Sequence, residues 1–141
     1  MNLYIANIIT EGGIALNRLK VLFHVNEAGR WPRVLLNAKN FINDVGRGQA
    51  NIEILANGAG VAGYAPAAGT CGASAEGNDD GKILAEMKNL SDQGVVFAAC
   101  RNALGMHAIA ENSLPVFVMV VPAGITELAK KQAEGFAYIK Q

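Results

Sequence analysis

Short apolar runs rich in β-branched residues alternate along this chain with segments whose apolar residues recur at helical spacing. The runs have the length of buried strands, and they occupy residues 19–25, 50–56, 95–99, 116–121 and 136–139. The helical segments between them are residues 31–45, 82–90, 102–110 and 125–133. Because parallel strands are joined by a crossover that is usually a helix, this alternation predicts an α/β domain with a mostly parallel sheet covered on both faces.

The segment 31–45 carries the clearest helical pattern. Its apolar residues follow one face of a helix, with Pro32 in the first turn and Gly46 at the end. In contrast, residues 58–77 are rich in glycine and alanine and have little periodicity. We expect a long loop there with room for one short helix.

Length and composition fit one domain. The 141 residues are 51% apolar and 17% charged, which is enough for one sizeable core. We assign that domain to residues 19–141 and treat residues 1–18 as an N-terminal extension. Within the extension, Gly12 and Gly13 form a flexible break after the apolar patch. The 12 basic residues balance the 12 acidic ones, so neither a nucleic acid nor an anionic membrane is an expected partner.

The same features predict a soluble, cytoplasmic protein. The apolar run 116–121 is far short of the roughly 20 residues needed to span a bilayer. The apolar patch at residues 3–9 has no basic stretch before it, which argues against a secretory signal. The two cysteines, Cys71 and Cys100, do not stand in contexts typical of a structural disulfide.

Cys100 stands where the strand 95–99 gives way to a helix. The free N–H groups and the positive dipole end of a helix stabilise an anion such as a thiolate, and the neighbouring Arg101 adds a positive charge. The plainer interpretation is a small buried hydrophobic side chain, which free cysteines often are. We weigh the two equally. For Cys71, an inert loop cysteine is favoured over a resolving thiol.

Ligands of parallel α/β sheets bind outside the carboxyl ends of the strands. The polar or small residues expected at these ends are His24, Asn26, Asn57, Arg101, Asn102 and Gly124. His24 is a candidate base for the thiol, although a hydrogen-bonded core or interface histidine is the favoured interpretation. His107 is expected to pack or to lie at the surface.

Two other kinds of site are disfavoured. Residues 58–63 match the dinucleotide pattern G-x-G-x-x-G after a strand, but Pro66 prevents the long helix that should hold the pyrophosphate. A flavodoxin-like nucleotide binder is therefore only a third hypothesis. No Cys/His pair has the spacing of metal ligands, so we predict no metal site.

Several segments together resemble the DsrE/DsrF/TusD-like family. These are residues 19–25, Trp31, residues 52–58, residues 94–104 around Cys100, the turn Val121-Pro122-Ala123-Gly124 and the tail 132–140. The resemblance covers residues 19–141 and is closest to the small stand-alone, uncharacterised branch. It implies a three-layer α/β/α sandwich with a five-stranded sheet, assembled as homotrimers or hexamers. In the sulfur-relay members, the cysteine that matches Cys100 carries a persulfide.

The leading functional hypothesis is a sulfur carrier. Cys100 would accept sulfane sulfur from a donor thiol protein and pass it to an acceptor thiol, a sulfurtransferase-like step that needs no cofactor. Asn26, Asn57 and Asn102 would orient the bound sulfur, and the loop 57–81 would screen it from water. The alternative is a non-catalytic, oligomeric small-ligand-binding protein in which Cys100 is structural.

Overall fold

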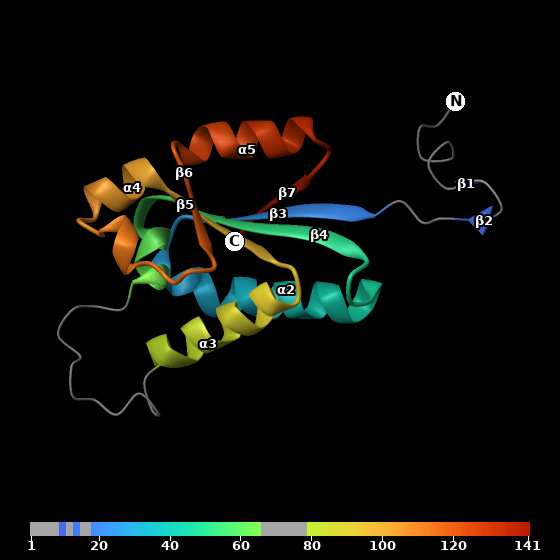
Figure 1. Ribbon diagram of the computed structural model, residues 1–141, viewed down its shortest axis with the longest axis horizontal. Helices are drawn as coiled ribbons and strands as arrows, with labels where there is room; N and C mark the ends of the chain where they lie inside the picture. The colour runs from blue at the N-terminus through green and yellow to red at the C-terminus, as the bar shows by residue number, and fades with distance from the viewer. Residues whose placement is uncertain (1–8, 11–12, 15–17, 66–78) are drawn as a thin grey trace.

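Five parallel strands form the central sheet, in the order β6-β5-β4-β3-β7 (Figure 1). They are β3 (Leu19–Val25), β4 (Ala50–Ala56), β5 (Val96–Cys100), β6 (Val118–Val121) and β7 (Ala137–Lys140). The computed structural model describes residues 9–10, 13–14, 18–65 and 79–141. Within these ranges, β1 (Ile9–Thr10) and β2 (Gly13–Ile14) pair in a separate antiparallel sheet.

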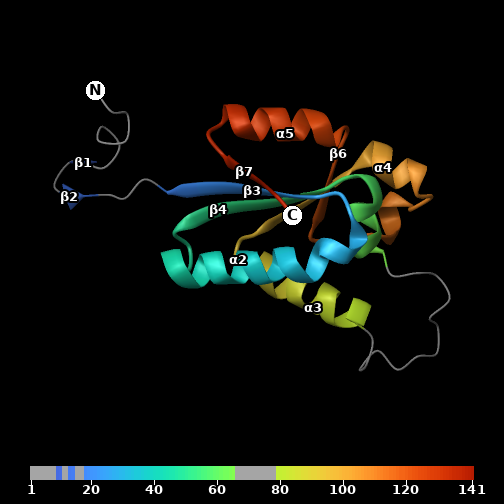
Figure 2. The ribbon, with the colours of Figure 1, turned by 180° about the vertical axis from the view of Figure 1, so that it is seen from behind.

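Helices cover both faces of the sheet, as Figures 1 and 2 show. Helices α2 (Trp31–Val45) and α3 (Asp79–Asp92) lie on one face, and α5 (Gly124–Ala133) lies on the other. The short helix α4 (Arg101–Met106) follows β5 at its carboxyl end. The segments η1 (Ala28–Arg30), η2 (Gly58–Tyr64) and η3 (Glu111–Ser113) are 3-10 turns. The predicted three-layer α/β/α fold with a five-stranded sheet is thereby confirmed.

The core is divided unequally by the sheet. The larger part lies under α2 and α3, where Trp31, Tyr64 and Phe97 pack with ring centroids 5.0 to 6.4 Å apart. Burial raises the pKa of Tyr64 well above its usual range, so the hydroxyl stays protonated and donates a hydrogen bond to the Ala98 carbonyl at 3.0 Å. The smaller part, under α5, consists of Leu22, Leu55, Ala98, Val121 and Leu128.

The locally patterned elements appear where they were predicted. The strands β3 and β4 and the helix α2 have the expected bounds. The helix α3 begins three residues earlier than expected, β6 begins two residues later, and β7 is displaced by one residue. Such shifts are ordinary because element ends are only weakly determined by local pattern.

The helix after Cys100 was predicted to reach residue 110, and that prediction is wrong. Helix α4 ends at Met106 in a Schellman motif: the Ile109 N–H donates to the Leu104 carbonyl at 2.9 Å, and the Ala108 N–H donates to the Gly105 carbonyl at 3.2 Å. Ala108 adopts a left-handed conformation, with φ of 52°. The apolar spacing of the sequence does not reveal this turn, because the residue in the left-handed position is not glycine.

The glycine-rich segment after β4 is a packing element in its described part. A Cβ atom on Gly60 would lie 2.3 Å from the Val25 carbonyl oxygen, and one on Gly63 would lie 2.0 Å from Trp31 Nε1. The Trp31 indole also donates to the Gly60 carbonyl at 2.8 Å. These glycines therefore allow η2 to approach β3 and α2 closely, which accounts for the G-x-G-x-x-G spacing without a nucleotide. Cys71 and the rest of the expected loop up to residue 78 lie outside the described residues.

Candidate functional site

The carboxyl ends of the strands bring a small group of side chains together on the face that α5 covers. His24 is near the end of β3, Asn57 follows β4, Cys100 ends β5, and Gly124 begins α5 after β6. The parallel register aligns Ala56 with Ala99, and Cys100 with Val121. Residues far apart in the chain thus meet at one edge of the sheet, as expected for a parallel α/β fold.

His24 is held by hydrogen bonds on both ring nitrogens. Its Nε2 atom is 2.7 Å from Asn57 Oδ1, and its Nδ1 atom is 2.7 Å from the Tyr138 hydroxyl of β7. An amide oxygen only accepts hydrogen bonds, so Nε2 carries the proton, and in the neutral ring the Tyr138 hydroxyl donates to Nδ1. His24 is 8% exposed. Both nitrogens are therefore engaged, and the geometry does not support His24 as a base for the thiol.

Gly124 is in contact with both Asn57 and Cys100. A Cβ atom built on Gly124 would lie 3.2 Å from the Asn57 Cβ, 3.2 Å from the Cys100 Cβ and 3.5 Å from Asn57 Nδ2. The absent side chain of Gly124 thus lets the first turn of α5 approach the strand ends. Cys100 and the Asn57 amide flank the same point beside this helix terminus.

Cys100 is 6% exposed, and it is the free cysteine among the described residues. It is the N-cap residue of α4, but its side chain makes no capping hydrogen bond. Helix α4 has six residues, too few for the strong dipole that the sequence led us to expect. The first turn of helix α5 also lies beside the thiol. Helix α5 has ten residues and is the longer of these two helices.

The other predicted site residues are less closely associated with the thiol. The Arg101 Nε atom donates to the Glu111 carboxylate, so the positive charge expected to serve the thiolate is already paired. Asn102 is exposed. Asn26 is half-buried, and its Oδ1 atom is buried without a hydrogen-bond partner in the described part of the chain. His107 is exposed, as expected.

Two residues of this face were missed by the sequence reasoning. The sequence pattern predicts only that Tyr138 lies in a strand. The signal for its role is the parallel pairing of that strand with β3, which carries His24. Glu53 is one residue of the predicted strand 50–56, yet it is 2% exposed. A carboxylate within a mostly apolar strand was the available signal, because ionisable groups are seldom fully buried without a partner.

The Glu53 carboxyl group belongs to a charged cluster with α5. Burial raises its pKa from 4.5 to about 7, and the neighbouring Glu127 carboxyl group acts in the same direction, whereas Lys131 opposes them. The Lys131 Nζ atom is 3.6 Å from Glu53 Oε2 and 4.0 Å from Glu127 Oε1. The Glu53 Oε1 atom is buried without a hydrogen-bond partner in the described part of the chain. With its pKa raised to about 7, the Glu53 carboxyl group keeps its proton up to near-neutral pH.

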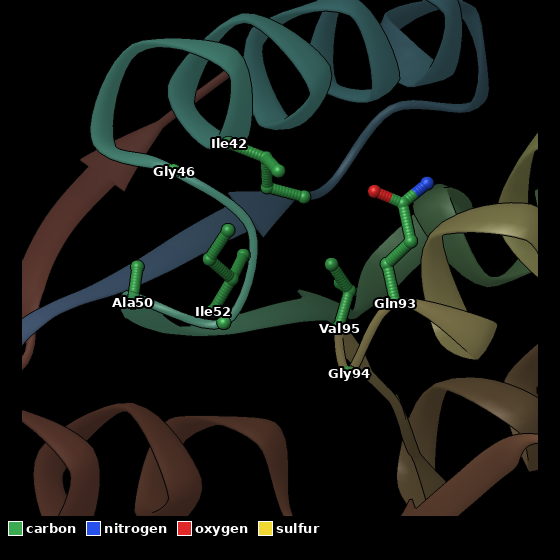
Figure 3. A pocket seen from close by; sticks show the side chains of 8 residues that line it. Ile42, Gly46, Ala50, Ile52, Gln93, Gly94 and Val95 are labelled. Atoms are coloured by element: carbon green, nitrogen blue, oxygen red, sulfur yellow. The ribbon is translucent and has the colours of Figure 1, made fainter.

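The described surface has hollows away from Cys100. One lies between the end of α2 and the amino ends of β4 and β5 (Figure 3), and its volume is about 10 Å³, room for one water molecule. Another, of about 340 Å³, borders Glu53, Val96, Met119 and Lys131. Neither is lined by Cys100.

The described ranges contain neither a metal-ion cluster nor a membrane-spanning helix. There, no group of three or more His, Cys, Asp or Glu side chains is arranged to hold a metal ion. Over the same ranges, no helix has both the length and the apolar character needed to cross a membrane.

Comparison with known proteins identifies one family. The family model described as the DsrE/DsrF-like family matches residues 19–140. The fold is also similar to the solved structure of MTH1491, a protein of unknown function from Methanobacterium thermoautotrophicum. The two sequences are 26% identical, the match covers 87% of this chain and 99% of the other, and the TM-score is 0.71. No curated protein matches the chain.

Proposed function

This chain belongs to the DsrE/DsrF-like family, and from that premise we propose that it is a sulfur carrier whose acceptor is Cys100. The observation that carries the proposal is the position of this thiol. Cys100 ends strand β5 and, like Asn57, lies beside Gly124, the first residue of α5. This is the edge at which parallel α/β sheets bind ligands.

The proposed reaction is an exchange at sulfur. The Cys100 thiolate attacks the outer sulfur of a donor persulfide, R–S–SH. A new S–S bond forms to Cys100 while the S–S bond of the donor breaks, so Cys100 becomes Cys–S–SH and the donor leaves as the thiolate R–S⁻. An acceptor thiolate then takes the outer sulfur by the same exchange. The sulfane sulfur moves without a net change in oxidation state, so no cofactor takes part.

The burial of Cys100 limits the donors that can react. Only 6% of the Cys100 residue is exposed, so we expect a small or extended sulfur donor to reach the thiol in this conformation and a bulky one to be excluded. The Asn57 amide and the helix terminus at Gly124 supply polar surroundings in place of water, which favours an anionic sulfur over a neutral one.

Sulfur uptake is tested directly by mass. The wild-type protein is incubated with sodium polysulfide, and the intact protein and its peptides are then weighed. We expect the Cys100 peptide to gain the mass of one sulfur atom and to lose it on addition of a thiol. Cys100→Ser should remove this gain, whereas Cys71→Ser, the matched control, should retain it. If the Cys100 peptide of the wild type gains no sulfur, or if the gain is on Cys71 alone, the carrier proposal is wrong.

One observation favours a second candidate function. Cys100 packs within the larger hydrophobic cluster, as a purely structural cysteine would. In that case the protein is a non-catalytic, oligomeric small-ligand-binding member of the family. The side chains of Val96 and Met119, which are 42% and 44% exposed on the β5 and β6 strands, are apolar surface that a second copy would cover. The same polysulfide experiment separates the two functions, because a structural Cys100 would remain unmodified.

A further inference from the structure

Tyr138, His24 and Asn57 form a continuous chain of hydrogen bonds that ends beside Cys100. The Tyr138 hydroxyl lies 2.7 Å from His24 Nδ1, and His24 Nε2 lies 2.7 Å from Asn57 Oδ1. The three residues come from β7, β3 and the end of β4. Histidine and tyrosine are 114 positions apart in the chain, so only the pairing of β7 with β3 brings them together.

The direction of this chain determines which end of the Asn57 amide faces the thiol. Since Oδ1 accepts from His24, the Nδ2 group lies on the other side of the amide. Nδ2 is 3.5 Å from the point where a Gly124 Cβ would stand, and the Cys100 Cβ is 3.2 Å from the same point. Within the described residues, Nδ2 forms no hydrogen bond that would hold it elsewhere. Its N–H groups are therefore available to a sulfur atom attached to Cys100.

The opposite orientation of the amide would disfavour an anionic sulfur. With the amide turned over, Oδ1 would face Cys100 and present a negative partial charge to a thiolate or to the outer sulfur of a persulfide. An N–H donor stabilises such an anion, whereas an oxygen repels it. When His24 binds Oδ1 of Asn57, the amide N–H groups face Cys100 and stabilise an anionic sulfur. If His24 bound Nδ2 instead, the amide oxygen would face Cys100 and destabilise it.

We propose that Tyr138 and His24 are positioning residues that fix the Asn57 amide with its N–H groups toward the sulfur of Cys100. This inference rests on the proposed sulfur-carrier function and adds the group that stabilises the anionic sulfur. Tyr138 secures His24 Nδ1, so His24 keeps its proton on Nε2 and donates it to Asn57 Oδ1. Without the hydroxyl, Nδ1 of a nearly buried ring has no partner, and the amide loses its fixed orientation.

The first test removes one hydroxyl from the chain of hydrogen bonds. Tyr138→Phe should load sulfur from sodium polysulfide about tenfold more slowly than the wild type, as expected for the loss of one hydrogen bond. Tyr64→Phe is the matched control, because it deletes a buried tyrosine hydroxyl that donates to the Ala98 carbonyl and takes no part in this chain of hydrogen bonds. It should keep the wild-type loading rate. Circular dichroism confirms that both variants are folded.

A spectroscopic readout separates positioning from a general structural effect. The chain has two histidines, His24 and His107, so His107→Gln assigns the imidazole signals in ¹⁵N NMR spectra. The wild type and Tyr64→Phe should show His24 protonated on Nε2, with an N–H that exchanges slowly with water. In Tyr138→Phe this N–H signal should broaden or disappear.

The second variant reverses the polarity of the group that faces the sulfur. Asn57→Asp keeps an oxygen that accepts from His24 Nε2 but replaces the N–H donors with a negative charge. It should preserve the slowly exchanging His24 N–H signal and still reduce sulfur loading by more than about tenfold. Loading at the wild-type rate in Tyr138→Phe or in Asn57→Asp overturns the inference, whatever the spectra show.

Failure of the carrier function is distinguishable from failure of this inference. If the wild type takes up no sulfur, the carrier function fails, and alkylation of the Cys100 peptide by iodoacetamide then measures anion stabilisation in the same variants. Slower alkylation in Tyr138→Phe and Asn57→Asp, but not in Tyr64→Phe, supports the positioning role. Equal rates in all the variants overturn it.

Discussion

Gly124 is the residue whose small size permits the candidate site. Its backbone φ is not in the left-handed region, so the need for glycine comes from space and not from conformation. The first turn of α5 rests against Asn57 and Cys100 at this residue, and each would have a new Cβ 3.2 Å away. The atoms that the new Cβ would contact are the Cβ atoms of Asn57 and Cys100. A Cβ atom moves only with the backbone, so a side-chain rotation cannot relieve these contacts.

Gly124→Ala should therefore damage both the site and the fold. We expect a loss of about 1–3 kcal/mol in the free energy of unfolding, as for other overpacked positions, and slower sulfur loading at Cys100. Urea denaturation and the polysulfide assay measure the two effects. Gly105→Ala is the control, because its Cβ would meet nothing within 4 Å and alanine favours a helix. If Gly124→Ala is as stable as Gly105→Ala, the close approach of α5 to Asn57 and Cys100 does not require a glycine at position 124.

At the scale of elements, the end of α4 determines how the chain leaves the site. The Schellman hydrogen bonds from Ile109 and Ala108 close the helix, and the chain then turns toward η3, where Glu111 meets Arg101. The motif requires a left-handed residue, and the chain supplies Ala108, with φ of 52°. A left-handed conformation costs an L-residue about 1–2 kcal/mol, a cost that glycine avoids.

Ala108→Gly should stabilise the protein for this reason. The gain in the free energy of unfolding should be about 0.5–1 kcal/mol, because the greater flexibility of glycine in the unfolded chain offsets part of the relief. Thermal denaturation provides the measurement. Ala110→Gly is the matched control: Ala110 is also exposed but has φ of −72°, and this substitution should be destabilising. A loss of stability in both variants would contradict the strain at Ala108.

At the scale of the whole molecule, the contact between the sheet and α5 includes an ionisable group that resists ionisation. The pKa of Glu53 is raised from 4.5 to about 7, chiefly by burial and then by Glu127. The folded state therefore holds a proton that the unfolded chain releases near its ordinary pKa. The associated stability is fully present below pH 4.5 and is lost as the pH rises through about 7.

The free energy of unfolding of the wild type should accordingly fall by about 2–3 kcal/mol between pH 5 and pH 8. Glu53→Gln replaces the acid with a neutral group of similar shape, so most of this dependence should disappear in the variant. Urea denaturation across this pH range is the measurement. Glu86→Gln, at an exposed position near Lys39, should retain the wild-type slope. An undiminished slope in Glu53→Gln would assign the pH dependence to other groups.

The elements whose pattern is local can be predicted from the sequence alone. The strands β3 and β4 and the helix α2 followed from runs of apolar residues and from helical periodicity, because each pattern is contained in one segment. The place of Cys100 at a strand end followed in the same way. Periodicity was insufficient at the end of α4, where a single left-handed alanine stops the helix.

The surroundings of Cys100 depend on how the strands and helices pack. The tertiary structure joins Tyr138 to His24 across 114 positions, places the start of α5 against Asn57 and Cys100, pairs Arg101 with Glu111 and buries Glu53 beside Lys131. The physical reason is that these contacts depend on the order and register of the strands. Local periodicity establishes which residues face a core, but the strand order determines which of them meet.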